Sequence, residues 1–165
     1  MILISHRGNV NGPNPEQENT PVAIDSVLEQ NLFCEVDVWR IDGKFYLSHD
    51  PPDKKKHNIH FSFFEQRAQN LIIHCKNIYA LQYFHEAISD GFHYFWHQDD
   101  EYTLTSWNWI WAYPGKTVPY FSEMISVAVM PESTMYEMNE NQFKNFAAVC
   151  TDYVNQYDQV NTVRS

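Results

Sequence analysis

The sequence predicts an α/β fold with a largely parallel sheet, and three observations lead to this prediction. Short apolar strand candidates alternate with helical segments through most of the 165 residues. Turn signals such as Asp42-Gly43 and Pro114-Gly115 separate these segments. Hydrophobic residues make up 44% of the chain and charged residues 19%, a balance that supports a packed core. We expect a single domain over residues 1–165.

The N-terminal half reads as two strands, a helix and a hairpin. Thr20 and Pro21 are of the types preferred at the N-cap and first position of a helix, which we expect to run to about Gln30. Asp42-Gly43 is a hairpin turn signal. A further helix is expected over Phe61–Gln69. The strands are expected at Ile2–Ser5, Leu32–Trp39 and Lys44–Ser48.

The C-terminal half adds strands with fewer helices between them. One helix is expected over Ile78–Asp90, stopped by Gly91, and another over Glu137–Phe146. Between Phe92 and Tyr113 the strands follow one another too closely for a parallel crossover, which needs about a dozen residues, so we expect a meander there. The strands are expected at Leu71–Cys75, Phe92–His97, Tyr102–Thr105, Trp109–Tyr113, Ile125–Met130 and Ala147–Thr151.

The charge of the chain limits its partners. There are 21 acidic and 11 basic residues, giving a formal net charge of −10. Nucleic-acid binders usually show the opposite balance, and a general basic surface for anionic lipid is missing. We therefore expect a small-molecule partner and no nucleic acid. An anionic substrate would need a local cationic site or a bound metal ion.

The hydropathy pattern predicts a cytoplasmic protein. No stretch reaches the roughly 18 apolar residues of a membrane helix, and Met1–Ile4 is too short for the core of a signal peptide. The three cysteines, Cys34, Cys75 and Cys150, lie in apolar runs without metal-type spacing, as buried free thiols in a reducing compartment would.

Residues with chemical functions follow the predicted strands at their C-terminal ends, where sites form in parallel α/β sheets and barrels. Each cluster is small, and a single histidine near a strand end is more often a surface or core residue. Their combination and order are more informative. The clusters are His6-Arg7-Gly8, Glu35 with Asp37, His49-Asp50, and His74 with Lys76.

Glu35 and Asp37 are two positions apart on a predicted strand, so both face the same side. Two neighbouring buried carboxylates repel each other and are costly to desolvate, and a divalent cation resolves both problems. Oxygen ligands suit a hard ion such as Mg²⁺ or Ca²⁺. The alternative is the exposed face of an edge strand, where two acids are well solvated.

Three tryptophans, Trp107, Trp109 and Trp111, alternate at strand spacing. They could form a stacking platform for a ligand, but a core stripe or an oligomer interface is the better interpretation. The turn at His97-Gln98-Asp99-Asp100 is interpreted as solvated rather than as part of a site.

Taken in order, the motifs resemble the glycerophosphodiester phosphodiesterase family, in the superfamily that includes phosphatidylinositol-specific phospholipase C. The resemblance is dense over residues 2–50 and weaker at 71–76 and 150–152. It implies a TIM-type (β/α) barrel, a divalent metal ion and hydrolysis of a small glycerophosphodiester-like substrate in lipid metabolism. The matching stretches are Ser5-His6-Arg7-Gly8, Glu18-Asn19-Thr20, Cys34-Glu35-Val36-Asp37-Val38, Asp42-Gly43, Ser48-His49-Asp50 and Cys150-Thr151-Asp152.

The resemblance also implies roles for individual residues. His6 and His49 match the two catalytic histidines, which act as general acid and base in an order the sequence leaves open. Arg7 and Lys76 match residues that face the phosphate, and Arg can grip it with two hydrogen bonds. Glu35 and Asp37 match two metal ligands. Glu18 and Asn19 match an acid and an amide on a loop near the metal and the phosphate.

Three departures separate this chain from the family pattern. Gln17 replaces a proline before Glu18-Asn19-Thr20. His74 stands where a third acidic metal ligand is usual, and a neutral imidazole is a softer ligand than a carboxylate. The chain is also short for a barrel of about 250 residues, so some helices must be missing and the barrel trimmed or irregular.

Two alternatives to hydrolysis remain open at this stage. One is a phospholipase D-like lyase or transferase that forms a cyclic phosphate. The other is a non-catalytic binding protein on a reduced barrel. The replacement of an acidic metal ligand by His74 and the short chain support this alternative. The presence of both histidines together with Arg7 and the two carboxylates favours an enzyme.

Overall fold

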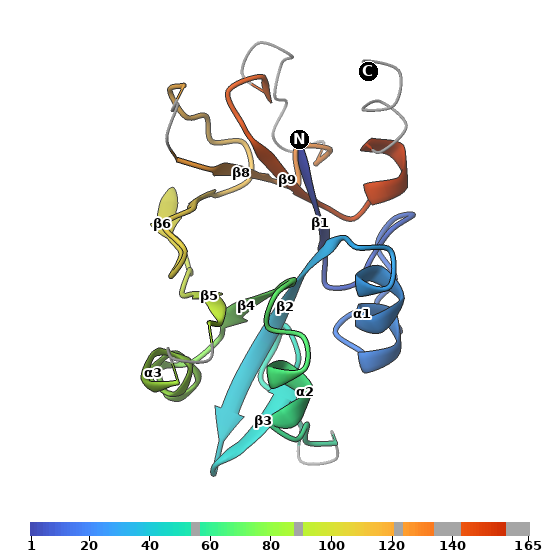
Figure 1. Cartoon of the computed structure of the whole chain (residues 1–165), viewed down its shortest axis with the longest axis vertical. Coiled ribbons are helices and arrows are strands. Elements are labelled where there is room, and N and C mark those ends of the chain that lie inside the picture. Colours follow the sequence, from blue (N-terminus) through green and yellow to red (C-terminus); the bar gives the residue numbers. More distant parts are fainter. Residues whose placement is uncertain (54–56, 88–90, 121–123, 134–142, 158–165) are drawn as a thin grey trace.

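The computed structural model describes residues 1–53, 57–87, 91–120, 124–133 and 143–157. Strands and helices alternate in its first half, and strands follow one another in its second half (Figure 1). The helices are α1 (Pro21–Leu28), α2 (Ser62–Glu65) and α3 (Ile78–Glu86). The strands are β1 (Ile2–His6), β2 (Phe33–Ile41), β3 (Lys44–Leu47), β4 (Leu71–Cys75), β5 (His93–Phe95), β6 (Tyr102–Leu104), β7 (Ile110–Ala112), β8 (Ser126–Val129) and β9 (Ala148–Thr151).

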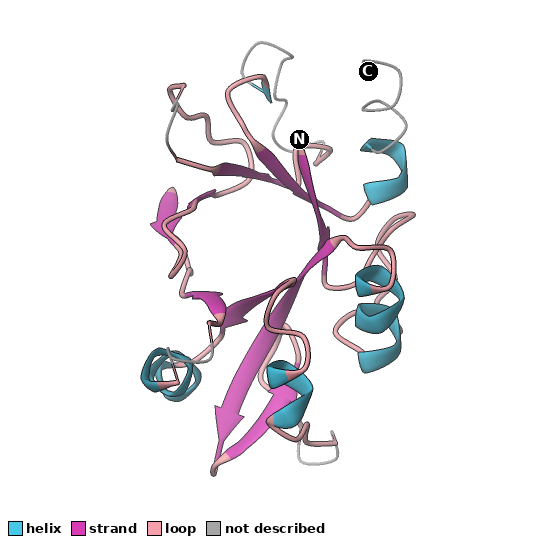
Figure 2. Cartoon of the chain, viewed as in Figure 1, coloured by secondary structure: helices cyan, strands magenta, loops and turns pink. Residues whose placement is uncertain are grey.

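The strands form one sheet that curls into a ring (Figures 1 and 2). Their order is β5-β4-β2-β1-β9-β8-β7-β6, and β3 pairs with β2 outside this path. Neighbours on the ring are parallel except for β6 and β7, which are antiparallel, as the expected meander requires. The fold is thus a trimmed TIM-type barrel with a mixed α/β character, which confirms the fold class.

The ring closes between β5 and the turn after β6 without a regular strand pair. The Ser106 amide donates to the Tyr94 carbonyl at 2.9 Å, and the Tyr94 amide donates to the Ser106 hydroxyl at 2.9 Å. We call this short junction the seam. None of the described residues between β5 and β8 is helical, so the trimming lies where the sequence leaves no room for crossovers.

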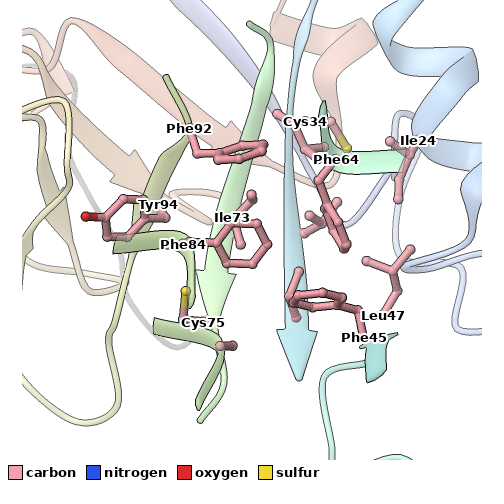
Figure 3. Packing of buried hydrophobic residues seen from close by; sticks show 14 of the residues in the cluster. Ile24, Cys34, Phe45, Leu47, Phe64, Ile73, Cys75, Phe84, Phe92 and Tyr94 are labelled. Atoms are coloured by element: carbon pink, nitrogen blue, oxygen red, sulfur yellow. The ribbon is translucent and has the colours of Figure 1, made fainter. Parts of the chain in front are cut away.

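Alternation along the strands produces two apolar layers. Inside the ring, six strands contribute one buried cluster that includes Ile4, Ile72, Trp111 and Cys150. A second cluster fills the space between the outer faces of β2–β5 and the three helices. Figure 3 shows part of this outer layer, with Phe64 and Phe84 from α2 and α3 packed near strand residues.

Local signals explain the elements nearest the site. Thr20 accepts a hydrogen bond from the Ala23 amide and caps α1, and Pro21 begins the helix. Asn77 caps α3 in the same way by accepting from the Ala80 amide. Both helices therefore start immediately after the loops that carry site residues.

The predicted helix over Phe61–Gln69 is wrong in length, because α2 ends at Glu65. After it, the Leu71 amide donates to the Arg67 carbonyl at 3.0 Å, so the chain turns directly into β4. Most of the predicted helix at 137–146, and the end of the one at 78–90, lie outside the described residues. In the part of the chain that is described, no helix has both the length and the apolarity of a membrane span.

Candidate active site

The parallel strands β1, β2 and β4 end on the same side of the ring, and a cavity of about 420 Å³ opens there. Six of the nine site residues expected from the sequence line this cavity, although they come from distant parts of the chain, and Asp37 lies beside it without lining it. The six are His6, Arg7, Glu35, His49, His74 and Lys76. The structure therefore brings together the clusters that the sequence places at strand ends.

His6 is the last residue of β1 and is buried. Its Nδ1 lies 2.9 Å from Oδ1 of Asp152. The same oxygen accepts a hydrogen bond from the side-chain amide of Asn9 at 2.8 Å. Burial alone would lower the pKa of His6, but the hydrogen bond to Asp152 and the charge of Glu35 outweigh it and raise the pKa above its usual value. With Nδ1 engaged, Nε2 is the nitrogen left for proton exchange.

The turn after β1 requires the Arg7-Gly8 sequence. Arg7 has a φ of 57° and Gly8 a φ of 91°, in the left-handed region that favours glycine. A Cβ at Gly8 would lie 3.0 Å from the Cβ of Ala23 on α1, so the glycine also allows the helix to approach. This turn directs the Arg7 side chain toward the end of β2.

Glu18 and Asn19 do not line the cavity but hold residues that surround it. Asn19 donates to Oδ2 of Asp37 at 3.0 Å and accepts from the Asp37 amide at 2.9 Å. Glu18 accepts from Arg7 at 3.3 Å and from Asn9 at 3.0 Å. Both residues therefore lie around the site.

The two carboxylates of β2 are buried inside the ring, with exposed fractions of 2% for Glu35 and 0% for Asp37. The alternative of an exposed edge strand is wrong, because β2 lies between β1 and β4. Asp37 is surrounded by cations: Arg7 Nε lies 2.9 Å from Oδ2 and Lys76 Nζ 3.4 Å from Oδ1. Burial alone would raise the pKa of Asp37, but its contact with His74 and the charge of Arg7 hold that pKa well below its usual range.

His74 is the third member of this group. Its Nδ1 lies 3.2 Å from Oδ1 of Asp37 and 3.6 Å from Oε1 of Glu35, and its Nε2 lies 2.8 Å from the His97 carbonyl oxygen. Burial would lower the pKa of His74, but the contacts with both carboxylates raise it to about 9. The ring stacks on Phe95, with centroids 4.6 Å apart.

Glu35, Asp37 and His74 together fit a divalent cation. One ligand atom from each lies within 4.8 Å of the others. Asp37 Oδ1 is contacted by His74 and Lys76, whereas the buried Glu35 Oε2 has no hydrogen-bond partner among the described residues. Buried carboxylate oxygens normally find a partner, and an unpaired one in such a cluster is an atom that a cation would bind.

His49 is the most accessible of the predicted residues. It follows β3 and lines the cavity, with half of its side chain exposed. Its Nδ1 lies 2.9 Å from Oδ1 of Asp50, which is itself exposed. His6 is thus held in a buried network, whereas His49 lies at the rim.

Several residues of the site have no signal in the sequence that assigns them to it. Asp152 contacts His6, although the sequence indicates it only as part of a strand, and Asn9 donates to Asp152. His97 lines the cavity and its carbonyl accepts from His74, although the sequence suggests a solvated turn there. No local pattern links residues so far apart. The opposite side of the cavity is apolar, formed by Trp111, Tyr113, Pro114, Val129 and Met130.

The tryptophans do not share one role. Trp109 and Trp111 are buried in the apolar layer inside the ring, as the core interpretation predicted. Trp107 is 37% exposed and stacks on His93, with centroids 4.6 Å apart. The stripe is therefore mainly structural, although Trp111 also lines the cavity.

Comparison with known proteins gives one structural match. No protein-family model matches the sequence, and no curated protein matches it significantly. Among solved structures, the chain is similar to a crystal structure described as a "putative glycerophosphodiester phosphodiesterase from Galdieria sulphuraria", at 12% identity and a TM-score of 0.49, covering 99% of this chain and 98% of the other.

Proposed function

We propose that the protein is a metal-dependent phosphodiester hydrolase acting on a small, glycerophosphodiester-like substrate. The observation that carries this proposal is the convergence of two histidines, an arginine, a lysine and Glu35 on one cavity, with the buried Asp37 in contact with the arginine and the lysine. A volume of about 420 Å³ suits a small ligand rather than a macromolecule.

Arg7 and Lys76 are proposed to bind the phosphate. Both line the cavity and are mostly buried, so their charges act with little screening by water. Contacts with Asp37 fix both side chains before substrate arrives. Phosphoryl transfer depends mainly on positioning and charge neutralisation, which a fixed arginine and lysine supply.

His6 and His49 are proposed as the proton-transfer pair. Imidazole exchanges protons near neutral pH, so one ring can accept a proton from the attacking nucleophile and the other can donate one to the leaving alkoxide. Asp152 orients His6 through Nδ1, which directs proton exchange to Nε2. The rim position of His49 leaves it accessible to substrate.

The carboxylates of Glu35 and Asp37 are proposed to hold a divalent cation, for which their oxygens alone would favour Mg²⁺ or Ca²⁺. When bound, such an ion neutralises charge on the phosphoryl oxygens. Asn19 keeps Asp37 in place through two hydrogen bonds. The positions of both carboxylates are thus set by the protein.

Hydrolysis of bis(4-nitrophenyl) phosphate tests the proposal. We expect His6→Ala and His49→Ala each to lower kcat about 10²-fold to 10⁴-fold, the range for losing a general acid or base. His57→Ala, at an exposed histidine that does not line the cavity, serves as the matched control and should retain full activity. Circular dichroism checks that each variant is folded.

Wild-type turnover in either cavity variant would refute the two-histidine mechanism. Product analysis in ¹⁸O-labelled water adds a second test. Incorporation of one labelled oxygen into the phosphomonoester supports hydrolysis by water. A stable cyclic phosphate from a substrate that carries a neighbouring hydroxyl would instead contradict hydrolysis.

A further inference from the structure

The hydrogen bond at Nε2 of His74 fixes which nitrogen faces the carboxylates. A carbonyl oxygen can only accept, so the 2.8 Å contact with the His97 carbonyl places a hydrogen on Nε2. A bound cation would displace the proton on Nδ1 and meet the lone pair of this nitrogen. This is the nitrogen 3.2 Å from Asp37 and 3.6 Å from Glu35.

The ring of His74 has little freedom to turn away. Phe95 stacks on it with an interplanar angle of 13°, and Phe95 in turn packs against Trp111 with centroids 4.5 Å apart. His74 belongs to β4 and pairs in register with Asp37 and Phe95 on the two neighbouring strands. Such contacts around a histidine are the usual means of orienting a metal ligand.

From these contacts we infer that His74 is a nitrogen ligand that makes the site selective for a first-row transition ion, such as Mn²⁺ or Co²⁺, over Mg²⁺ and Ca²⁺. The inference rests on the metal site of the proposed function and narrows the class of ion that it takes. An imidazole nitrogen favours first-row transition ions over Mg²⁺ and Ca²⁺, which prefer oxygen ligands. Within that series Mn²⁺ gains least from nitrogen and Co²⁺ gains more.

The charges around the group support the same conclusion. Glu35 and Asp37 supply two negative charges, and Arg7 and Lys76 place two positive charges next to Asp37. Electrostatic attraction for a cation is therefore weak, which disadvantages hard ions that bind mainly through charge. An ion that gains from coordination by nitrogen depends less on net charge.

Metal binding by the full chain tests the inference without any assay of activity. Chelator-treated protein is titrated calorimetrically with MnCl₂, CoCl₂, MgCl₂ or CaCl₂, and pulsed electron paramagnetic resonance of the Mn²⁺-loaded protein detects ¹⁴N coupling from a ligating imidazole. We expect Mn²⁺ to bind at least tenfold more tightly than Mg²⁺ and to show this coupling. In His74→Glu the coupling should be lost and the ratio of Mn²⁺ to Mg²⁺ affinity should fall at least tenfold.

Two further variants make the outcome decisive. His74→Gln removes the nitrogen ligand without adding charge and should also lose the ¹⁴N coupling, while His57→Gln, at an exposed histidine, should keep it. Absence of coupling in the wild type, or its persistence in both His74 variants, overturns the inference. Hydrolysis assays separate the two proposals: cleavage that depends equally on Mg²⁺ in wild type and His74→Glu contradicts only the ion selectivity, and nitrogen ligation without any cleavage contradicts only the hydrolase.

Discussion

His6 and Asp152 lie 146 positions apart in the chain, yet their side chains meet at 2.9 Å. Asp152 is also held by Asn9, and its amide donates to the Glu132 carboxylate at 3.0 Å. Burial alone would raise the pKa of Asp152, but the hydrogen bond from His6 outweighs it and lowers the pKa. The pair therefore favours a charged carboxylate and a protonated imidazole.

Replacing Asp152 by Asn should lower the pKa of His6, because a neutral amide stabilises the protonated ring less than a carboxylate does. We expect the limb of the kcat/KM profile that belongs to His6 to move to lower pH. An NMR titration of the His6 ring checks the same shift directly. Asp50→Asn, which alters the partner of His49, is the control and should leave the His6 resonance unchanged. An unmoved His6 pKa in Asp152→Asn would contradict the assigned coupling.

His93 is a second buried histidine with the opposite tendency. It is fully buried between Trp107 and Trp109, and burial lowers its pKa to about 3. Its Nε2 lies 2.8 Å from the Thr105 hydroxyl, whereas its Nδ1 has no hydrogen-bond partner within the described part of the chain. The native fold thus keeps this ring neutral.

The pKa of His93 predicts acid sensitivity. Between pH 6.5 and 3 the unfolded chain binds a proton on this histidine that the native state does not. The free energy of unfolding should therefore decrease as the pH is lowered through this range, by up to about 1.4 kcal/mol per pH unit from this group. Urea unfolding at pH 7, 6, 5 and 4 measures the slope. His93→Gln should show a smaller slope than wild type. Equal slopes would mean that His93 contributes nothing to acid unfolding.

The sequence predicts the site residues that belong to short motifs but misses those that meet only in space. His6, Arg7, Glu35 and Asp37 stand out because strand alternation and strand ends are local properties. The contact of Asp152 with His6 has no local signature, since a single aspartate after a strand is common. Asp152 and Asn9, which support His6, could therefore not be assigned this role from the sequence, whereas Glu18 and Asn19, which also support other residues, belong to a short motif and could be named.

Asn77 joins a helix to the sheet directly after Lys76. Its Oδ1 accepts from the Ala80 amide at 3.0 Å and from the Arg40 amide at 3.2 Å, and its Nδ2 donates to the Arg40 carbonyl at 2.9 Å. One side chain thereby caps α3 and ties it to the end of β2. Because Lys76 directly precedes Asn77, these hydrogen bonds also restrict the backbone that carries Lys76.

We expect Asn77→Ala to lower the free energy of unfolding by about 2 kcal/mol, because it removes a helix cap and leaves partly buried backbone groups of Arg40 without their side-chain partner. Asn77→Asp is the matched variant, since it keeps the accepting oxygen and loses only the donor to the Arg40 carbonyl. It should retain more than half of the lost stability. Chemical denaturation measures both, and equal losses would contradict the separation of the two roles.

Most elements follow from local signals, and the exceptions have physical reasons. Leu71–Cys75 is predicted to the residue because an apolar run is bounded by turns, and the antiparallel β6 and β7 follow from short spacing. The predicted helix over Phe61–Gln69 is too long, because the entry of the chain into β4 overrides helix propensity after Glu65. Closure of the ring could not be predicted, since it depends on contacts between strands.

The seam joins neighbouring parts of the ring without a strand ladder, and the Ser106 side chain reinforces it. It does so alongside the backbone hydrogen bond from the Ser106 amide to the Tyr94 carbonyl and the Thr103 hydroxyl, which donates to the Trp96 carbonyl at 3.0 Å. The Ser106 hydroxyl accepts from the Tyr94 amide and donates to the Phe92 carbonyl at 3.0 Å. Every other pair of neighbours around the ring shares a regular strand ladder. The ring should therefore open at this junction before it opens elsewhere.

Ser106→Ala should destabilise the fold by about 1–3 kcal/mol, because it leaves the buried Tyr94 amide without a partner. Hydrogen exchange should accelerate at the amides of β5 first, while those of β1 and β2 stay protected. Ser26→Ala, the same change at an exposed position on α1, is the control and should have little effect. Uniform acceleration in all strands would contradict a local opening.

The lack of a strand ladder at the seam affects how the protein should associate at high concentration. When the junction parts, the free flanks of β5 and β6 present unpaired backbone groups, and such groups readily take up a strand from another chain. The short length of both strands and the acidity of the chain limit this exchange under native conditions. Mild destabilisation should thus lead to intermolecular strand pairing that begins here.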